Sequence, residues 1–208
     1  MSDRLNQLLE QAGSPPLNFE ASEKFTAYLT LLQKWNTRTN LTAIRDAEGI
    51  QTRHFLESIL CARALPDGIS TLLDLGTGAG FPGLPIAILR PEISVTLAES
   101  QNKKAAFLRE ATRTLTLPNV RVHGERAETL PTRYSCVTLR AVDKMASALP
   151  IAIQLLEPNG LLALLTTTTD SPTLQQLSEA ESHFTWNPPI PLPKETTRIL
   201  LLGHKITV

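Results

Sequence analysis

The stretch "LLDLGTGAGFPGLPIAIL", residues 72–89, decides how the rest of the chain is interpreted. An apolar run ends at Asp74 and Leu75, a loop with four glycines follows, and a second apolar run begins at Leu84. A strand that passes through a glycine loop into a helix is a common setting for a bound nucleotide or nucleoside. The stretch therefore predicts a ligand site where the strand ends.

Beyond this loop, β-rich runs alternate with helical stretches. The expected strands are 71–75, 93–98, 120–123, 135–139 and 161–165, and the expected helices are 84–89, 102–115, 127–130 and 144–155. Such alternation predicts a parallel sheet with helices on both faces. No long helix separates "HFTWNPP" from "RILLLGHKITV", which predicts an antiparallel hairpin at one edge. The expected fold is α/β, with a Rossmann-like, mostly parallel doubly wound sheet.

The residues before the glycine loop have helical periodicity. Ser22 is the expected N-cap of a first helix, whose apolar positions are Phe25, Tyr28, Leu29, Leu32 and Trp35. A second helix is expected over 47–65, with Arg53, His54 and Glu57 on its more exposed side. The segment "PDGIS" indicates a linker after it. We therefore predict an N-terminal helical cap over residues 1–66 and a ligand-binding domain over 67–208.

Composition indicates an ordinary globular protein. Of the 208 residues, 42% are hydrophobic and 19% are charged, and no run approaches the ~20 apolar residues that span a bilayer. The two cysteines form no CxxC pair, and no His/Cys/Asp cluster has metal spacing. We expect a cytoplasmic protein without a metal or a membrane partner. Twenty basic and twenty acidic residues neither exclude nor support nucleic acid, because local patches attract phosphates.

The glycine loop itself distinguishes two classes of ligand. Residues 78–83 match the dinucleotide pattern G-x-G-x-x-G, but Pro82 removes an amide donor that a pyrophosphate needs. Gly76, Gly78 and Gly80 form the turn proper, and Asp74 before them is expected at the mouth of the site. A carboxylate there would repel a diphosphate and would suit S-adenosylmethionine, which carries an ammonium and a sulfonium.

Glu99, which ends the second predicted strand, is placed to accept both hydroxyls of a ribose. NAD enzymes share this feature, so Glu99 indicates a nucleoside without choosing which one. Taken with the loop, it favours S-adenosylmethionine over NAD.

The motifs also resemble those of a known family. "LLDLGTGAGFPGLPIAILRPE", "GERAETL" and "LRAV", with "KWNTRTNLTAIRD" and "RHFLESI" before them, resemble the bacterial 16S ribosomal RNA guanine-N7 methyltransferases, also called glucose-inhibited division protein B. The similarity runs from about Phe25 to Lys205. It implies a class I methyltransferase fold and S-adenosylmethionine-dependent methylation of N7 of one guanosine. The implied substrate is 16S ribosomal RNA, within the 30S subunit or an assembly intermediate.

The resemblance also implies roles for individual residues. Gly76 and Phe81 would line the cofactor loop, Ala127 and Glu128 would lie beside the adenine, and Arg140 would lie near cofactor and substrate. Two positions depart from the family pattern. Thr166-Thr167 stands where the family usually has Lys-Gly at the end of the fifth strand, and Glu57 stands where it usually has Asp.

Arg140 is the residue that we expect to act on the substrate. At the carboxyl end of a strand it can hold a phosphate or donate to guanine O6; the alternative is a structural pair with Asp143 or Glu128. His54 is expected to be a structural hydrogen-bonder or an RNA contact. The expected RNA contacts are Arg38, Arg45 and Arg53 in the cap, with Lys194, Arg198 and Lys205 as further candidates.

The chemistry of N7 methylation agrees with what the motifs lack. Guanine N7 is a bare lone pair, so methylation removes no proton and needs no general base. The sequence has no Pro-Cys nucleophile, and no Asn- or Asp-Pro-Pro-aromatic motif follows the fourth strand. Other hypotheses stay open: a small-molecule or protein methyltransferase, an NAD-dependent oxidoreductase, and a non-catalytic RNA-binding protein. A cleft rimmed by arginines favours RNA, whereas a deeply roofed pocket favours a smaller substrate.

Overall fold

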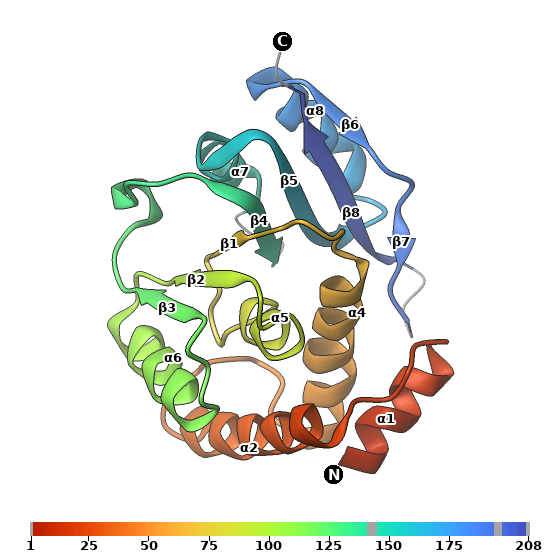
Figure 1. Ribbon diagram of the computed structural model, residues 1–208, viewed down its shortest axis with the longest axis vertical. Coiled ribbons are helices and arrows are strands. Elements are labelled where there is room, and N and C mark those ends of the chain that lie inside the picture. The colour runs from red at the N-terminus through yellow and green to blue at the C-terminus, as the bar shows by residue number, and fades with distance from the viewer. Residues whose placement is uncertain (1, 141–144, 194–196, 207–208) are drawn as a thin grey trace.

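The computed structural model describes residues 2–140, 145–193 and 197–206 (Figure 1). These residues form a sheet of order β3-β2-β1-β4-β5-β8-β6, with β7 paired to β8. The strands are β1 (Thr71–Leu75), β2 (Ser94–Ala98), β3 (Val120–His123), β4 (Tyr134–Arg140), β5 (Leu156–Thr167), β6 (Phe184–Trp186), β7 (Ile190–Pro191) and β8 (Arg198–Lys205). β1 to β5 are parallel, and β6, β7 and β8 pair antiparallel. The predicted Rossmann-like sheet with an antiparallel edge is confirmed.

Helices cover both faces of the sheet. They are α1 (Ser2–Gln11), α2 (Phe19–Asn36), α3 (Ala47–Gly49), the π-helix η1 (Ile50–Phe55), α4 (Leu56–Ala64), α5 (Gly83–Leu89), α6 (Asn102–Thr114), the 3-10 turn η2 (Ala127–Thr129), α7 (Met145–Gln154) and α8 (Ser171–Glu181). Side chains alternate along each strand, so Leu72 joins the core under α4 and α5 whereas Leu73 joins the core under α7. α2 lies across α5 and α6, at the bottom of Figure 1.

The N-terminal helices differ from the prediction in two details. α2 begins at Phe19, because the side chain of Asn18, and not Ser22, accepts the Ala21 amide as N-cap. Ser22 is buried inside the helix. The helix expected over 47–65 consists of two α-helical segments, α3 and α4, with the π-helix η1 between them, a feature often found at functional sites.

The hydrophobic core continues from these helices to the sheet. Phe25 and Tyr28 of α2 belong to the same buried cluster as Leu84 of α5 and Leu97 of β2. The division at residue 66 stays a prediction.

Some expectations fall outside the described residues, namely Asp143, Lys194 and the first residue of the helix predicted over 144–155. Among the helices that the structure does describe, none has the length and apolar character of a bilayer span. Within those same ranges, no group of three or more His, Cys, Asp or Glu side chains is arranged to hold a metal ion.

Gly83 sets how closely α5 approaches the sheet. A Cβ on this residue would lie 2.3 Å from Cδ2 of Leu97 and 2.7 Å from Oδ2 of Asp74. We expect Gly83→Ala to lower the free energy of unfolding by about 1–3 kcal/mol, as overpacking of a core does. Urea unfolding measures this change.

The matched control for this prediction is Gly124→Ala. Its added methyl would come 2.6 Å from the end of the flexible Arg109 side chain and 3.7 Å, an ordinary contact distance, from Cβ of Ala105. We expect a change below about 0.5 kcal/mol, as for most surface substitutions. Equal losses in the two variants would contradict this explanation of Gly83.

Candidate active site

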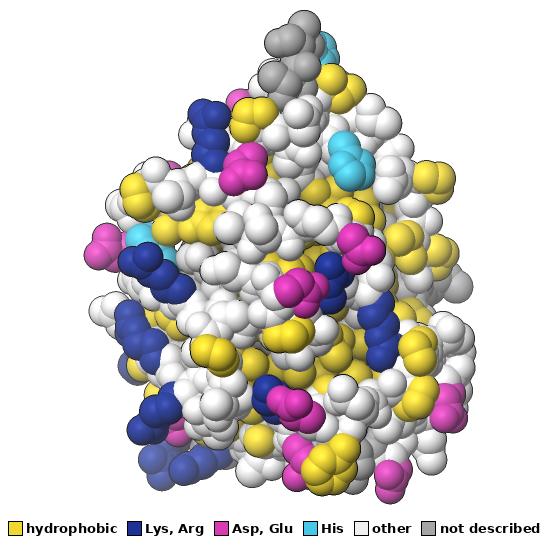
Figure 2. Space-filling model, in the orientation of Figure 1, with side chains coloured by type: hydrophobic (Ala, Val, Ile, Leu, Met, Phe, Trp, Pro, Cys, Tyr) yellow, Lys and Arg dark blue, Asp and Glu magenta, His cyan; other side chains and the backbone are white. Residues whose placement is uncertain are grey.

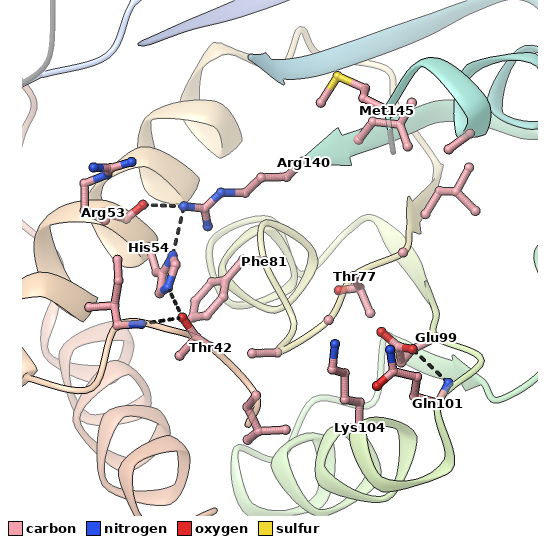
Figure 3. A pocket seen from close by; sticks show the side chains of 18 of the residues that line it. Thr42, Arg53, His54, Thr77, Phe81, Glu99, Gln101, Lys104, Arg140 and Met145 are labelled. Carbon is pink, nitrogen blue, oxygen red and sulfur yellow. Dashed lines mark hydrogen bonds between the residues drawn. The ribbon is translucent and has the colours of Figure 1, made fainter. Parts of the chain in front are cut away.

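A cavity of about 650 Å³ lies at the carboxyl ends of β1, β2 and β4. The strand order reverses between β1 and β4, which is where open α/β sheets bind ligands. The glycine loop after β1 and Glu99 after β2 line one side of the cavity, and Thr42, Arg53 and His54 of the N-terminal segment line the other. Arg140 reaches across from the end of β4 (Figure 3).

Asp74 lies beneath the glycine loop, so the expected position at the mouth of the site is wrong. Its carboxylate is fully buried and accepts hydrogen bonds from the Thr77 hydroxyl at 2.5 Å, the Gly83 amide at 2.8 Å and the Thr138 hydroxyl at 3.0 Å. Burial raises the pKa of this carboxyl, and the three hydrogen bonds oppose the rise. Asp74 therefore holds the loop to β1, β4 and α5.

The amides at the start of α5 are engaged within the protein. Pro82 has no amide hydrogen, the Gly83 amide binds Asp74, and the Leu84 amide donates to the Gly80 carbonyl at 2.9 Å. A pyrophosphate at a helix start needs such donors. The loop therefore fits a ligand without a diphosphate. Pro82 lacks an amide donor, and the amides of Gly83 and Leu84 are already hydrogen-bonded within the protein.

The turn glycines differ in what surrounds them. Gly76 and Gly78 line the cavity at φ +68° and +60°, and a Cβ on Gly76 would meet nothing within 4 Å. A ligand can therefore lie directly against this backbone. Gly80 lies outside the lining, and a Cβ there would come 2.8 Å from the Tyr28 hydroxyl. This glycine is required by the packing of Leu84 of α5, whose Cδ1 would lie 2.5 Å from the added Cβ, and of α2, whose Tyr28 donates to the Ala79 carbonyl.

Glu99 lies where the prediction placed it. Its side chain lines the cavity, and Oε1 accepts the Gln101 amide at 2.8 Å, which fixes the carboxylate (Figure 3). Ala127, which is buried, and Glu128, which is exposed, lie outside the lining. Their role beside an adenine stays a prediction.

Arg140 is a buried cation that contacts the cap. Its Nη2 donates to the Arg53 carbonyl, to Nδ1 of His54 at 2.9 Å and to Oε2 of Glu57 at 3.0 Å. Its guanidinium carbon lies 5.6 Å from the centre of the Phe81 ring. Burial lowers the pKa of this guanidinium, and the negative charge of Glu57 opposes that effect. Among the described residues, the ion-pair partner of Arg140 is thus Glu57 and not Glu128, and the expected partner Asp143 lies outside the described residues.

Glu57 is almost completely buried, so the expectation that it is exposed is wrong. The exposed fraction of its side chain is 1%. Arg198, the first residue of β8, donates to both of its oxygens at 2.8 and 2.9 Å, and Arg53 approaches it at 3.4 Å. Because Arg140 and Arg198 come from strands far away in the chain, the periodicity of the helix alone could not reveal these partners. The sequence did offer one indication of a special role for Glu57: it lies within "RHFLESI" at a position where the family usually has another acid, Asp.

His54 has a defined tautomer in this arrangement. Arginine can only donate, so Nδ1 of His54 accepts from Arg140, and Nε2 carries the proton donated to the Thr42 hydroxyl at 2.7 Å. The imidazole stacks on Phe81 at 4.7 Å. Burial, followed by the charges of Arg140, Arg53 and Arg198, lowers the pKa of His54 to about 3. The ring is therefore neutral at physiological pH.

The basic residues expected to contact RNA separate into two groups. Arg53 and Arg198 line the cavity, and Lys104 of α6 lines it as well. Arg38 and Arg45 are exposed outside the cavity, and Arg45 donates to Asn40 at 2.8 Å. Lys205 instead donates to the Ile153 carbonyl at 3.1 Å. Figure 2 shows further Lys and Arg side chains along the flank formed by α6 and β3.

Thr166 and Thr167 stand where the family usually has Lys-Gly, and neither of them lines the cavity. Thr166 is fully buried, and the Thr167 hydroxyl donates to Asp170 at 2.6 Å. Thr167 pairs in register with Arg198, so the cation that lines the cavity here comes from the neighbouring strand.

A family model and the sequences of similar proteins agree on one family. The family model of rRNA small subunit methyltransferase G matches residues 21–186. The ribosomal RNA small subunit methyltransferase G of Roseiflexus sp. (strain RS-1) is 49% identical over 144 residues, which cover 66% of this chain and 62% of that protein. The protein of the same name from Xanthomonas oryzae pv. oryzae (strain MAFF 311018) is 49% identical over 137 residues, which cover 65% and 64%. The matches thus span less than two thirds of these relatives' length.

Among solved structures, M. jannaschii TYW2 in complex with AdoMet superposes with a TM-score of 0.58. The two chains are 14% identical, and the superposition covers 78% of each. At this identity the likeness concerns the fold alone.

The depressed pKa of His54 predicts a pH-dependent loss of stability. An unfolded histidine binds a proton below about pH 6.5, whereas folded His54 stays neutral down to about pH 3, so protonation favours the unfolded chain across that window. Between pH 7.5 and 5.5 this linkage costs about 1 kcal/mol. We expect His54→Asn, although less stable overall, to lose about 1 kcal/mol less than the parent between these two pH values.

Urea unfolding at both pH values measures the difference. His183→Asn, on an exposed histidine, is the matched control and is expected to behave as the parent. The same pH dependence in His54→Asn and the parent would contradict the assignment.

Proposed function

The chain belongs to the rRNA small subunit methyltransferase G family, and on this premise we propose that it methylates N7 of a guanosine in 16S ribosomal RNA, with S-adenosylmethionine as methyl donor. The observation that carries the proposal is one cavity with two unlike sides. The glycine loop and Glu99 suit a nucleoside without a diphosphate, and the arginines opposite suit an anionic substrate.

The residues present fit S-adenosylmethionine. Open space over Gly76 and Gly78 accommodates a ligand against the backbone, Phe81 forms an apolar wall, and the oriented carboxylate of Glu99 can accept ribose hydroxyls. The structural neighbour TYW2 holds AdoMet in a fold of the same type. Bound in this way, the cofactor supplies an electrophilic methyl group on sulfur.

The task left to the protein is to position the guanine. N7 attacks through its own lone pair, so no side chain has to remove a proton, and the neutral His54 serves as a hydrogen-bonding support. N7 must come to about 3 Å from the methyl carbon and stay in line with the breaking bond. Arg140 lies at the boundary of the two sides of the cavity, where a guanidinium can hold guanine O6 or an adjacent phosphate.

The distribution of charge supports an RNA substrate in spite of the zero net charge. Arg53, Arg140, Arg198 and Lys104 all line the cavity, and Arg38 and Arg45 are exposed in the N-terminal segment. The flank formed by α6 and β3 carries exposed Lys103, Arg109, Arg113 and Arg121. Such local patches attract phosphates by an electrostatic mechanism that depends on salt.

Methyl transfer to purified ribosomal particles tests the proposal. The protein is incubated with labelled S-adenosylmethionine and 30S subunits from cells that lack the modification, and the labelled nucleoside is then mapped. The proposal expects one N7-methylguanosine in 16S RNA. Parallel reactions with free 16S RNA, 50S subunits, bulk protein and small metabolites identify the substrate. Label in protein or a metabolite and none in 16S RNA would overturn the proposal.

Glu99 provides a test of the cofactor site. We expect Glu99→Ala to weaken S-adenosylmethionine binding by about 1.5–3 kcal/mol, because the ribose would lose hydrogen bonds to a charged group. Titration calorimetry would record this as roughly a ten- to hundredfold rise in Kd. Glu125→Ala, on an exposed acid outside the cavity, is the control and should bind as the parent does. Undiminished affinity in Glu99→Ala would place the ribose elsewhere.

Arg140 provides a test of the substrate side. We expect Arg140→Ala to reduce single-turnover methylation of 30S subunits about a hundredfold, because a guanine displaced by about 1 Å reacts that much more slowly. The affinity for S-adenosylmethionine should change by less than about threefold. Arg140→Lys should not restore the rate, because lysine cannot replace a planar fork of donors.

Calorimetry and methylation are measured on the same preparation of each Arg140 variant. Equal falls in rate and in cofactor affinity would identify Arg140 as a cofactor ligand. No fall in either would leave it a structural residue.

A further inference from the structure

The buried carboxylate of Glu57 is surrounded by guanidinium groups that come from three parts of the chain. Arg53 is one turn away in η1, Arg140 ends β4, and Arg198 begins β8. The exposed fractions of the Arg140 and Arg198 side chains are 10% and 11%. The cap, the parallel sheet and its antiparallel edge therefore meet at a single carboxylate.

Among the residues that the structure describes, cations gather around this one carboxylate. One carboxylate contacts three cations, His54 beside them is neutral, and the nearby Asp74 is engaged with Thr77, Gly83 and Thr138. Arginines brought this close repel one another, and an anion between them lowers that repulsion. Arg140 and Arg198 also line the cavity, where an anionic substrate would meet them.

The hydrogen bonds fix which edge of each arginine is used. Between described residues, Nη2 donates all the side-chain hydrogen bonds of Arg140, and it is directed toward the cap in Figure 3. Arg198 uses Nε and Nη2 in a bidentate pair with Glu57. A bidentate pair fixes the plane of a guanidinium as well as its position.

We propose that Glu57 is a positioning residue for methyl transfer, whose carboxylate holds Arg140 and Arg198 in the orientation that presents their other donors to the RNA. This inference rests on the proposed function. It assigns Glu57 no contact with substrate or cofactor, and it predicts an effect on turnover that is separate from binding. Loss of the carboxylate leaves all three cations in place to attract RNA but removes the group that orients them.

The experiment compares Glu57→Gln with Glu57→Asp by steady-state methylation of 30S subunits. Glu57→Gln keeps the size of the side chain and removes its charge, and we expect kcat to fall at least tenfold. KM for the subunits should stay the same or fall, because the wall of the cavity becomes more positive. S-adenosylmethionine affinity, measured by calorimetry, should stay within about threefold of the parent. Glu57→Asp restores the anion and should keep kcat within about threefold.

The matched control is Glu48→Gln, which removes a carboxylate from the same N-terminal segment that pairs with Arg4 away from the cavity. It should leave kcat and KM unchanged. A purely structural role for Glu57 would lower cofactor affinity and thermal stability together with kcat, and this result would overturn the proposal. Parent-like kcat in Glu57→Gln would also overturn it.

If Glu57→Gln alone does not fold, the double variant Glu57→Gln/Arg53→Gln keeps the net charge of the junction and is compared with Arg53→Gln. A kcat at least tenfold below that of Arg53→Gln supports the proposal, and an equal kcat overturns it. An inactive parent would instead refute the proposed function, so the two failures are distinguishable.

Discussion

The carboxylate of Asp74 is the constraint on which the cavity depends. It lies at the end of β1 and binds the Thr77 hydroxyl of the loop, the Thr138 hydroxyl of β4 and the first amide of α5. A buried carboxylate loses hydration, so it is stable only where several donors replace water. Those donors come from the glycine loop, from β4 and from α5. The open backbone at Gly76 and Gly78 is therefore held from below, and the ligand side of the loop stays free.

The loop is held from above by the N-terminal helices. Tyr28 donates to the Ala79 carbonyl, and the Phe81 ring packs between Tyr28 and His54 at 5.3 and 4.7 Å. His54 in turn accepts from Arg140. A chain of packed groups thus connects the residues proposed to hold the cofactor with the arginine proposed to hold the guanine. Proximity of the two reactants is the main contribution that a displacement at a bare lone pair requires, and a rigid connection of this kind provides it.

The sequence predicts correctly the features that depend on interactions between residues close together in the chain. Strand alternation and turn chemistry are local, so the parallel sheet, its antiparallel edge, the loop glycines and the position of Glu99 were all predicted. The misplaced residues depend on contacts between distant segments. Asp74 was expected to face the ligand because the pattern D-x-G-x-G-x-G does not show that Thr138 lies beneath it. Glu57 was expected in solvent because its partners Arg140 and Arg198 lie 83 and 141 residues further along the chain. Gly80 was placed with Gly76 and Gly78 in the ligand-binding turn, whereas the space beside it is occupied by Leu84 and Tyr28.

A chain with equal numbers of acidic and basic residues can still present a cationic site, because charge is distributed by the fold. Burying a single ion pair commonly costs as much in desolvation as the pair returns, so a junction of one carboxylate and three guanidinium groups is poorly explained by stability alone. It is better explained by the geometry that it imposes. Lysines on a surface would attract RNA as well, but their flexible side chains would leave the guanine free to move. Arginines anchored through one edge to a buried anion keep a fixed plane, and their other edge can meet a planar base or a phosphate with little further loss of entropy.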